Sequence, residues 1–362
     1  MREPRPRRKI LFVCGREPEY VRNRVILKAL RRQFDVIEIS SSLRNIILRS
    51  VSVFVKFILN HREYDLVFVG FYGHPLMLWV PRLTRSPIVF DAYLSTYDTL
   101  CFDRQWFEPT SLRGRLAYWL DSYACRAASR VILDTKAHVS YFTNTFGLSP
   151  QRFSVLYICC DTDIFYPRQA ASDGKFRVLY CGSFLPLHGV DHIMRAAKLL
   201  EEDPQVEVQL VGQGAIREEM IRLAGQLDLS NVQFPGWIPF QELPRAIAEA
   251  SVCLGGHFSA TAKAQRVIAS KTFQFLAMAK PTIVGDNPAS RELFTHKKNV
   301  YMCPPADSAA LADAILMLKG DEEMRRRIAQ EGYRLFMQKC SVDRISQSLK
   351  GTIESVYEDL SD

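Results

Sequence analysis

The sequence lacks the cysteine patterns of disulfide-bonded and zinc-binding proteins. Its nine cysteines are scattered along 362 residues, with no CxxC pair and no spacing to histidine that is typical of metal ligands. The basic start MREPRPRRK is not followed by an apolar segment with a cleavage site, as a secretory signal would require. These absences exclude a disulfide scaffold and favour a reducing compartment, so we expect a cytoplasmic protein.

Acidic residues are fewer than basic ones. Asp and Glu number 39 against 47 Lys and Arg, which gives a formal net charge of +8. Such a surplus favours an anionic partner: nucleic acid, a phosphorylated metabolite or an acidic membrane face. The basic residues are dispersed and form no recognisable nucleic-acid module, so we expect no nucleic-acid partner.

Short apolar runs alternate with helix-like segments along most of the chain. Runs typical of buried strands cover 9–14, 34–40, 64–71, 86–93, 130–135 and 153–158, then 176–183, 206–212, 231–237, 251–256 and 281–285. Helical spacing of apolar residues marks the segments 18–32, 112–128, 187–200, 216–227 and 240–250. This alternation predicts parallel, doubly wound α/β sheets.

A polar break at 165–176 separates the two runs of strands. A chain of 41.4 kDa is also long for a single core. We therefore predict two similar α/β domains with a cleft between them, covering 1–167 and 168–340, and a last amphipathic helix over 341–362.

Several short motifs follow one another in a fixed order, most clearly from 153 to 315. They are DTDIF at Asp161–Phe165, GSFL at Gly182–Leu185 with HGVD at His188–Asp191, VGQG at Val211–Gly214, VQFPG at Val232–Gly236, FQFLAMAKP at Phe273–Pro281, and Ala289–Leu293 with Glu292. In this order they resemble the retaining glycosyltransferases of family 4. The resemblance implies the GT-B fold: an N-terminal Rossmann-like acceptor domain facing a C-terminal nucleotide-sugar donor domain, with the last helix crossing back to the first.

The motifs depart from the family's pattern at its charged positions. The family grips the donor diphosphate with an Arg and a Lys, at places held here by Ser183 and His188. Its two glutamates, eight positions apart, fall on Arg266 and Gln274, and a usual glycine is Cys159. Negative charge on the diphosphate grows as the glycosidic bond breaks, so a transferase needs positive charge there.

Lys263, Arg266 and Lys271 offer that charge from the loop before the Phe273 helix. The pattern KAxRVxxxK is similar to a divergent branch of the family. No acidic residue occurs from 257 to 285, and helix N-terminal amides would add a favourable partial charge. We predict a relocated diphosphate clamp, with Arg266, Lys271 and His188 as the catalytic residues; the alternative is a solvated helix face.

The resemblance also implies the rest of the donor site. Gln274 would bind the ribose, Trp237 and Ile238 the base, and Glu292 would orient the sugar or its loop. The backbone around the nucleotide would come from small residues: Gly182, Ser183, Gly189, Gly212 and Gly214. The alternatives are a buried amide for Gln274, a surface turn for His188, core packing for Trp237 and tight turns for the glycines.

Two polar loops follow strands of the first domain. They contain Gly15 and Arg16, then Asp91, Ser95, Asp98 and Arg104. Because parallel sheets bind ligands at the carboxyl ends of their strands, we predict that these residues contact the acceptor. A structural cap or a salt-bridged loop is the alternative.

The segment 40–62 is helix-like, with polar residues at 45, 49, 52, 56 and 60 in one stripe. Arg44, Arg49, Lys56 and Arg62 lie among many apolar residues, so the segment is too charged to span a bilayer. It would either cover the first sheet or lie, with the basic residues 2–9, on the acidic inner face of a membrane.

The sequence therefore predicts a retaining, hexosyltransferase-like enzyme that needs no metal or cofactor. It would move a sugar from a nucleoside-diphosphate sugar to a hydroxyl of a glycan, a lipid-linked acceptor or a small molecule. Retaining transferases of this type let the leaving phosphate take the acceptor proton, so no paired carboxylates are required. The alternative is a catalytically inactive GT-B scaffold that acts as a binding protein.

Overall fold

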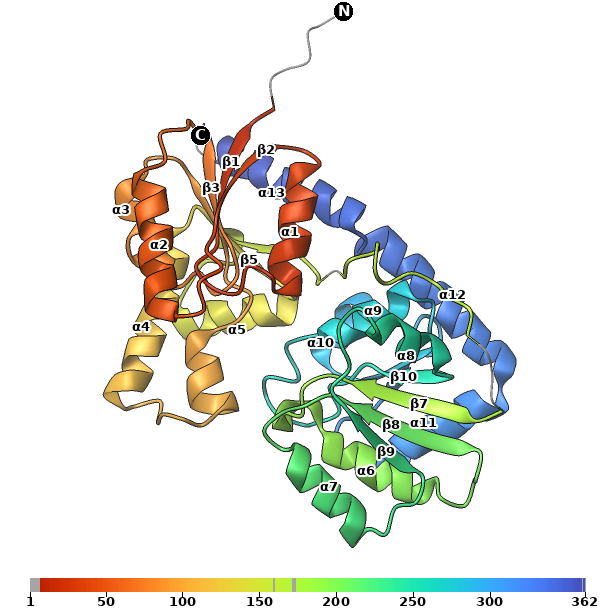
Figure 1. Cartoon of the computed structure of the whole chain (residues 1–362). Helices are drawn as coiled ribbons and strands as arrows, with labels where there is room; N and C mark the ends of the chain where they lie inside the picture. Colours follow the sequence, from red (N-terminus) through yellow and green to blue (C-terminus); the bar gives the residue numbers. More distant parts are fainter. Residues whose placement is uncertain (1–6, 159, 171–173, 360, 362) are drawn as a thin grey trace, which may run out of the picture. The chain divides into compact units, whose positions relative to one another are not determined.

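A computed structural model describes residues 7–158, 160–170, 174–359 and 361; the basic start at 1–6, Cys159 and residues 171–173 of the predicted break lie outside the described residues. The chain divides into two compact units (Figure 1), of which the first is Met1–Tyr157 with Val342–Asp362 and the second is Ile158–Ser341. Each unit contains one parallel sheet of six strands covered by helices, which confirms the predicted α/β class.

The sheet of the first unit has the strand order β2-β1-β3-β4-β5-β6. Its strands are β1 (Lys9–Val13), β2 (Asp35–Ile39), β3 (Leu66–Val69), β4 (Ile88–Asp91), β5 (Arg130–Leu133) and β6 (Phe153–Val155). Strands β3 and β4 are buried at every position, which is why the sequence shows continuous apolar runs rather than alternation. Each of these strands lies inside a predicted run.

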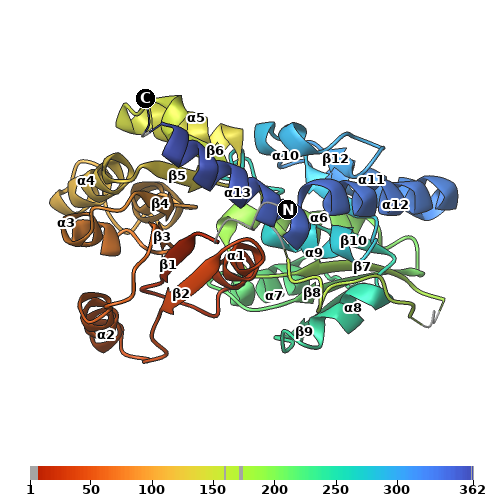
Figure 2. The same cartoon turned by 90° about the horizontal axis from the view of Figure 1, so that it is seen from above.

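Helices cover both faces of this sheet. On one face, α2 (Ile46–Ile58), α3 (Val80–Leu83), α4 (Leu112–Ala127) and α5 (Lys136–Phe146) contribute to a single apolar cluster with the strands. α1 (Val21–Arg31) instead packs against α13 (Val342–Glu358), the last helix of the chain, as seen from above in Figure 2. Ser346 of α13 donates a hydrogen bond to the Ala29 carbonyl of α1 over 2.8 Å. Short helical turns complete the unit: η1 (Leu76–Leu78), η2 (Asp98–Asp103) and η3 (Pro150–Arg152).

The sheet of the second unit has the order β12-β11-β10-β7-β8-β9. Its strands are β7 (Phe176–Cys181), β8 (Val206–Val211), β9 (Val232–Gly236), β10 (Val252–Leu254), β11 (Thr282–Gly285) and β12 (Tyr301–Cys303). Its helices are η4 (Pro186–His188), α6 (Val190–Leu199), α7 (Arg217–Gln226), α8 (Leu243–Glu249), α9 (Ser270–Ala277), α10 (Pro288–Leu293), α11 (Ser308–Gly320) and α12 (Glu322–Lys339). The edge strand β12 was not among the predicted runs.

In both sheets the strand order reverses at one point. In the second unit, β7 is followed outward by β8 and β9, and the chain then returns to place β10 on the other side of β7. In the first unit, the reversal falls between β1 and β3. In open α/β sheets, ligand sites lie at the carboxyl edge of the sheet next to such a reversal. Within the part of the chain that the structure describes, no helix is long and apolar enough to cross a bilayer.

The contact between α13 and α1 makes the last helix part of the first unit's core. Leu349 of α13 is fully buried, whereas Lys350 beside it is exposed. We expect Leu349→Ala to lower the free energy of unfolding by about 2–4 kcal/mol, since it leaves a cavity. Urea denaturation followed by circular dichroism measures the change. Lys350→Ala is the control, and equal stabilities of the two variants would contradict this packing.

Candidate functional site

The loops that leave β7 and β10 lie against each other at the strand reversal of the second unit. The Phe258 N–H donates to the His188 carbonyl over 3.1 Å, and Ser259 Oγ donates to the Leu187 carbonyl over 2.6 Å. A Cβ placed on Gly189 would lie 2.5 Å from the Ser259 nitrogen. The two loops are therefore clamped together, which fixes the side chains of His188 and His257.

Helix α9 begins directly at this crevice. Its N-cap is Ala269, which has no side-chain oxygen to cap the first amides of the helix. Thr272 Oγ1 donates to the Gly255 carbonyl at the end of β10 over 3.2 Å and so anchors the first turn. An uncapped helix N-terminus carries a partial positive charge and suits an anion.

Lys271, in the first turn of α9, is buried and has no hydrogen-bond partner for its ammonium group among the described residues. Its Nζ lies 3.7 Å from the centre of the Tyr180 ring, a cation–π contact. A Cβ built on Gly182, where φ is +146°, would come within 3.0 Å of the same Nζ. Burial lowers the pKa of Lys271 to about 7, since no anion compensates its charge.

Two histidines share the neighbourhood of Lys271. The rings of His188 and His257 stack with centroids 4.9 Å apart, and in each ring Nδ1 is buried without a hydrogen-bond partner among the described residues. Burial, followed by the charge of Lys271, lowers the pKa of His257 to about 3 and the pKa of His188 well below its usual value. Both rings are therefore neutral near pH 7.

The other predicted donor-site residues lie on the same few segments. Gln274 is buried one turn after Lys271, on the same side of α9. Lys263 and Arg266 are half-buried in the loop before α9, and the charge of Lys263 also lowers the pKa of both histidines. The Gln265 carbonyl accepts from the Ala289 N–H over 3.2 Å, which joins this loop to α10, where Glu292 lies half-buried.

A pocket of about 390 Å³ opens beside Gly182 at the carboxyl ends of β7 and β8. Its walls are Cys181, Gly182, Ser183, Val211, Gly212, Gln213, Trp237, Ile238, Phe240 and Leu243. A Cβ on Gly212 would overlap the Gly182 carbonyl oxygen, so only glycine allows the two loops to approach this closely. Trp237 is 61% exposed and therefore is not a core residue. The pocket offers one flat indole and open backbone, which suit a planar ring.

Taken together, these groups can hold a dianion next to an aromatic ring system. A buried ammonium group and two buried, neutral imidazoles lie near the N-terminus of α9, and the pocket with Trp237 adjoins them at Gly182. Phosphate oxygens are strong acceptors for charged donors and for helix N-termini. Within the described part of the chain, no cluster of three His, Cys, Asp or Glu side chains could hold a metal ion.

Sequence reasoning missed several residues of this site. His257, Tyr180 and Phe240 belong to none of the motifs, and they meet Lys271 or line the pocket only through tertiary packing; Gln213 lies inside the VGQG motif but was not predicted to line the site. A signal was present for His257, which follows the strand run 251–256 and its two glycines. A polar residue after a buried strand of a parallel sheet is placed at the binding edge.

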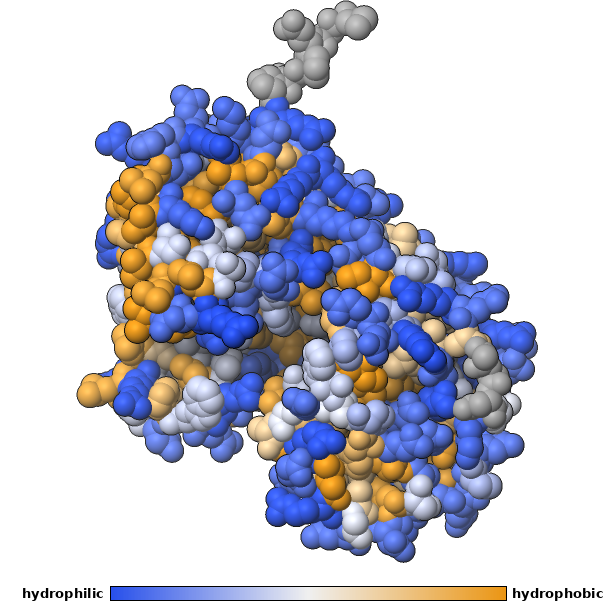
Figure 3. Space-filling view, viewed as in Figure 1, coloured by the Kyte–Doolittle hydropathy of each residue, from blue (hydrophilic) through white to orange (hydrophobic). Residues whose placement is uncertain are grey.

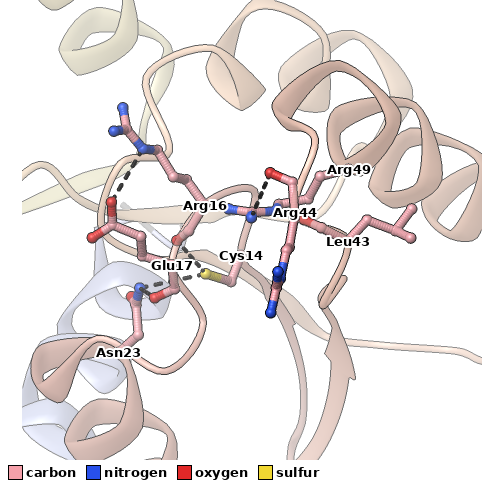
Figure 4. Close-up of polar contacts among 7 residues, drawn as sticks. All are labelled: Cys14, Arg16, Glu17, Asn23, Leu43, Arg44 and Arg49. Carbon is pink, nitrogen blue, oxygen red and sulfur yellow. Dashed lines mark hydrogen bonds and ion pairs between the residues drawn. The ribbon is translucent and has the colours of Figure 1, made fainter.

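In the first unit, the predicted acceptor residues lie at the carboxyl edge of the sheet. Gly15 is buried against Leu76, and Arg16 beside it is exposed, 3.3 Å from Glu17 (Figure 4). Asn23 of α1 holds this loop by donating to the Glu17 carbonyl over 3.0 Å. Glu17, Tyr72 and Tyr93 follow β1, β3 and β4 respectively, and all three have positive φ. Backbone strain of this kind is common at functional sites. Glu17, Tyr72 and Tyr93 were not among the predicted acceptor residues.

The other predicted acceptor residues have partners within the unit. The buried Asp91 carboxylate accepts two hydrogen bonds from Arg22, each over 2.7 Å, and Ser95 Oγ donates to Asp121 over 2.6 Å. Asp98 is buried at the start of η2, whereas Arg104 is exposed, 4.0 Å from Asp103. Asp91 and Ser95 thus hold the loop after β4 in place. Arg16 and Arg104 leave their guanidinium groups at the surface, and contact of all these residues with an acceptor stays a prediction.

The second unit also matches a known family by sequence. The family model described as "Glycosyl transferases group 1" matches residues 162–335. An MMP alpha-(1->4)-mannosyltransferase of Mycolicibacterium hassiacum is 24% identical over 265 residues, which are 70% of this chain and 58% of that protein. An alpha-D-kanosaminyltransferase of Streptomyces kanamyceticus is 22% identical over 291 residues, 76% of this chain and 72% of that protein.

Solved structures match the fold along nearly the whole chain. HepE from Anabaena in complex with UDP has a TM-score of 0.72 at 19% identity, over 96% of this chain and 100% of that one. A sucrose-phosphate synthase from Thermosynechococcus elongatus has a TM-score of 0.75 at 15% identity, over 98% and 100%. The chain therefore has the GT-B fold of these structures, and it spans a little over half the length of the first of these relatives.

The buried charge of Lys271 makes stability depend on pH. An unfolded lysine keeps its proton up to about pH 10, whereas the pKa of Lys271 in the fold is about 7. Between these values the unfolded state binds more protons, so the free energy of unfolding rises with pH across this window, and below it the full penalty persists. We expect Lys271→Met to stabilise the ligand-free protein at about pH 6 by about 1–4 kcal/mol.

Urea denaturation at about pH 6 and about pH 9, in buffer without phosphate, tests this expectation. Lys280→Met is the matched control, because Lys280 lies just after α9 but its ammonium group donates to the Ala248 carbonyl over 2.7 Å. The free energy of unfolding of the Lys280→Met variant should not rise at either pH. A Lys271→Met protein that is less stable than the parent at both pH values would contradict the uncompensated charge.

Proposed function

We propose that the protein is a retaining glycosyltransferase that moves a sugar from a nucleoside-diphosphate donor to a hydroxyl acceptor. One observation carries the proposal: Lys271 keeps a buried ammonium group with no hydrogen-bond partner among the described residues, at the strand reversal of the second unit. A buried lysine without an anion destabilises a fold, so its retention favours a site that is filled by an anion in use. Similarity to relatives that are named as glycosyltransferases supports a sugar nucleotide as this anion.

The proposed binding mode follows the geometry of the second unit. The diphosphate would lie between Gly182 and the N-terminus of α9, with the Lys271 ammonium and the α9 amides on its oxygens. His188, which is neutral, would donate one hydrogen bond, while His257 keeps its hydrogen bond to the Val267 backbone, and Arg266 and Lys263 would approach from the loop. The base would stack near Trp237 and Ile238, and Gln274 would bind the ribose.

In the proposed reaction, the acceptor hydroxyl attacks the anomeric carbon on the face from which the diphosphate departs. The bond from the anomeric carbon to the diphosphate oxygen breaks, and that oxygen takes the hydroxyl proton. The leaving group gains negative charge in this step. The Lys271 charge would stabilise it strongly, because the ammonium group is buried and the local dielectric is low. Protein cations and helix amides would fill the place that a divalent metal ion has in other transferases.

Removing a cation of the clamp should weaken the binding of nucleoside diphosphates. We expect Lys271→Ala and Arg266→Ala each to cost about 1–3 kcal/mol of binding free energy, the scale of a charged hydrogen bond. Isothermal titration with UDP, GDP, ADP and dTDP identifies the base and measures the loss. Lys280→Ala serves as the control, with unchanged affinity expected because Lys280 is bonded at the far end of α9.

The same proteins distinguish an enzyme from a binding scaffold. Incubation with sugar nucleotides should release free nucleoside diphosphate, and Lys271→Ala should release it more slowly. Tight nucleotide binding without turnover of any donor would favour the inactive GT-B scaffold. Unchanged nucleotide affinity in both clamp variants would remove the site assignment.

Proton uptake provides an independent signature of Lys271. A bound diphosphate raises the pKa of a nearby ammonium group, so the protein should take up protons on binding at about pH 8, where free Lys271 is largely neutral. Titrations in buffers with different ionisation enthalpies measure this uptake. Lys271→Met should abolish it, and equal uptake by parent and variant would assign the proton to another group.

A further inference from the structure

Helix α2 shows its apolar side to solvent. Only Val53 and Phe57 reach the core, and they lie on one side of the helix. The opposite side is made entirely of large apolar residues that are exposed: Ile47, Leu48, Val51, Phe54, Val55 and Ile58. Ile47 is 70% exposed. A helix that merely covers a sheet has the reverse pattern, with polar residues outward.

Helix α4 also exposes an apolar stripe to solvent. Its buried residues include Ala117, Asp121 and Ala124, and the stripe on the far side is formed by Leu112, Leu116, Trp119 and Tyr123. The spacing of four, three and four residues keeps this stripe on one face. Leu112 is 85% exposed and Leu116 is 60% exposed.

The turn η1 and helix α3 join the two stripes. The Trp79 ring makes edge contacts with Phe54 and Phe57 of α2, at 5.1 Å and 5.2 Å between centroids. On the other side, the Arg82 guanidinium lies over the Tyr123 ring of α4 at 5.4 Å. Leu78 and Leu83 are exposed between them. Figure 3 shows the resulting orange band along the left edge of the first unit, over α2 and α4.

We call this band the apolar–basic face and define it by the exposed residues Ile47, Leu48, Val51, Phe54, Val55, Ile58, Leu78, Leu83, Leu112, Leu116 and Trp119. Its charges are mostly positive. The ranges 39–62 and 66–90 contain no Asp or Glu, Asp121 of α4 is buried, and the exposed acidic residues at its border are Glu63, Asp65 and Glu108. The exposed cations around the face are Arg44, Lys56, Arg62, Arg82, Arg85, Arg113 and Arg115.

The loop before α2 carries part of this charge in a fixed geometry. Arg49 donates to the Leu43 carbonyl over 2.6 Å and approaches the Arg44 carbonyl at 3.4 Å, which ties the loop to the helix (Figure 4). The exposed Leu43 and Arg44 side chains are thereby held at the start of α2. An apolar residue next to a cation at a helix end suits the boundary between lipid headgroups and acyl chains.

We propose that the apolar–basic face binds the surface of an anionic lipid bilayer. Exposed apolar side chains would enter the headgroup boundary, Trp119 would sit at that level, and the arginines and lysines would meet the lipid phosphates. The like charges disfavour a second copy of this chain as the occupant, because self-association would bring cations against cations. Two helices with the same inverted pattern, joined through α3, form one surface on the first unit.

Vesicle sedimentation tests the proposal with the full chain. The probe is vesicles of phosphatidylcholine with about one third phosphatidylglycerol, compared with pure phosphatidylcholine, at low and high salt. The parent protein should bind the anionic vesicles, and high salt should weaken the binding. The triple variant Ile47→Ser, Val51→Ser and Ile58→Ser should lower the partition coefficient by about tenfold or more. Arg44→Gln with Arg85→Gln and Arg115→Gln should remove the preference for anionic lipid.

The control is Leu316→Ser with Met317→Ser, two exposed apolar residues of α11 in the second unit, which should leave binding unchanged. Circular dichroism and nucleotide affinity verify that each variant is folded. No binding of the parent to anionic vesicles at low salt overturns the proposal. A dimer in sedimentation velocity that the triple Ser variant abolishes, without vesicle binding, would assign the face to self-association instead.

Discussion

An uncompensated positive charge at Lys271 is the constraint on which the second unit's crevice depends. Burial alone would favour replacing it by an apolar side chain, because a buried ammonium without an anion is unfavourable. The surroundings hold it there nevertheless, with the centre of the Tyr180 ring 3.7 Å from its Nζ, Gly182 beside it and two imidazoles kept neutral by burial and then by its charge. The fold thus carries a local instability, which the proposed diphosphate would relieve.

The proposed donor site lacks the cations that the sequence resemblance implies. Ser183 and His188 stand where an Arg and a Lys are expected, and a neutral His188 cannot replace either charge. In the proposed site the charge would come from the loop and the first turn of α9, whose amides have no capping side chain. A motif can lose its charged residues while the electrostatic requirement stays, provided that the replacement arrives at the same atoms.

The sequence predicted the buried strands well and the site only in part, for physical reasons. Strands such as β3 and β4 are buried on both faces and leave continuous apolar runs, whereas β12 at the sheet edge was missed. The cations before α9 could be predicted because their spacing is local and no acidic residue balances them. The position of His257 after a strand run was a signal for the binding edge, but its stacking on His188 and the contact of Tyr180 with Lys271 arise from tertiary packing and leave no local signal. Asp91 was a candidate because it is an acidic residue in a loop after a strand. Its ion pair with Arg22 joins residues 69 positions apart and therefore leaves no local signal in the sequence.

The excess of basic residues has two physically different uses in this chain. At Lys271 the charge is dehydrated, so its interaction with an anion is strong and weakly screened by salt. On the apolar–basic face the arginines remain in water, where each contributes little alone and salt screens it, so apolar contact has to supply much of the attraction. A net charge of +8 by itself cannot separate these roles. Burial separates them, because Lys271 is enclosed by the fold, whereas the cations of the apolar–basic face border a broad exposed surface.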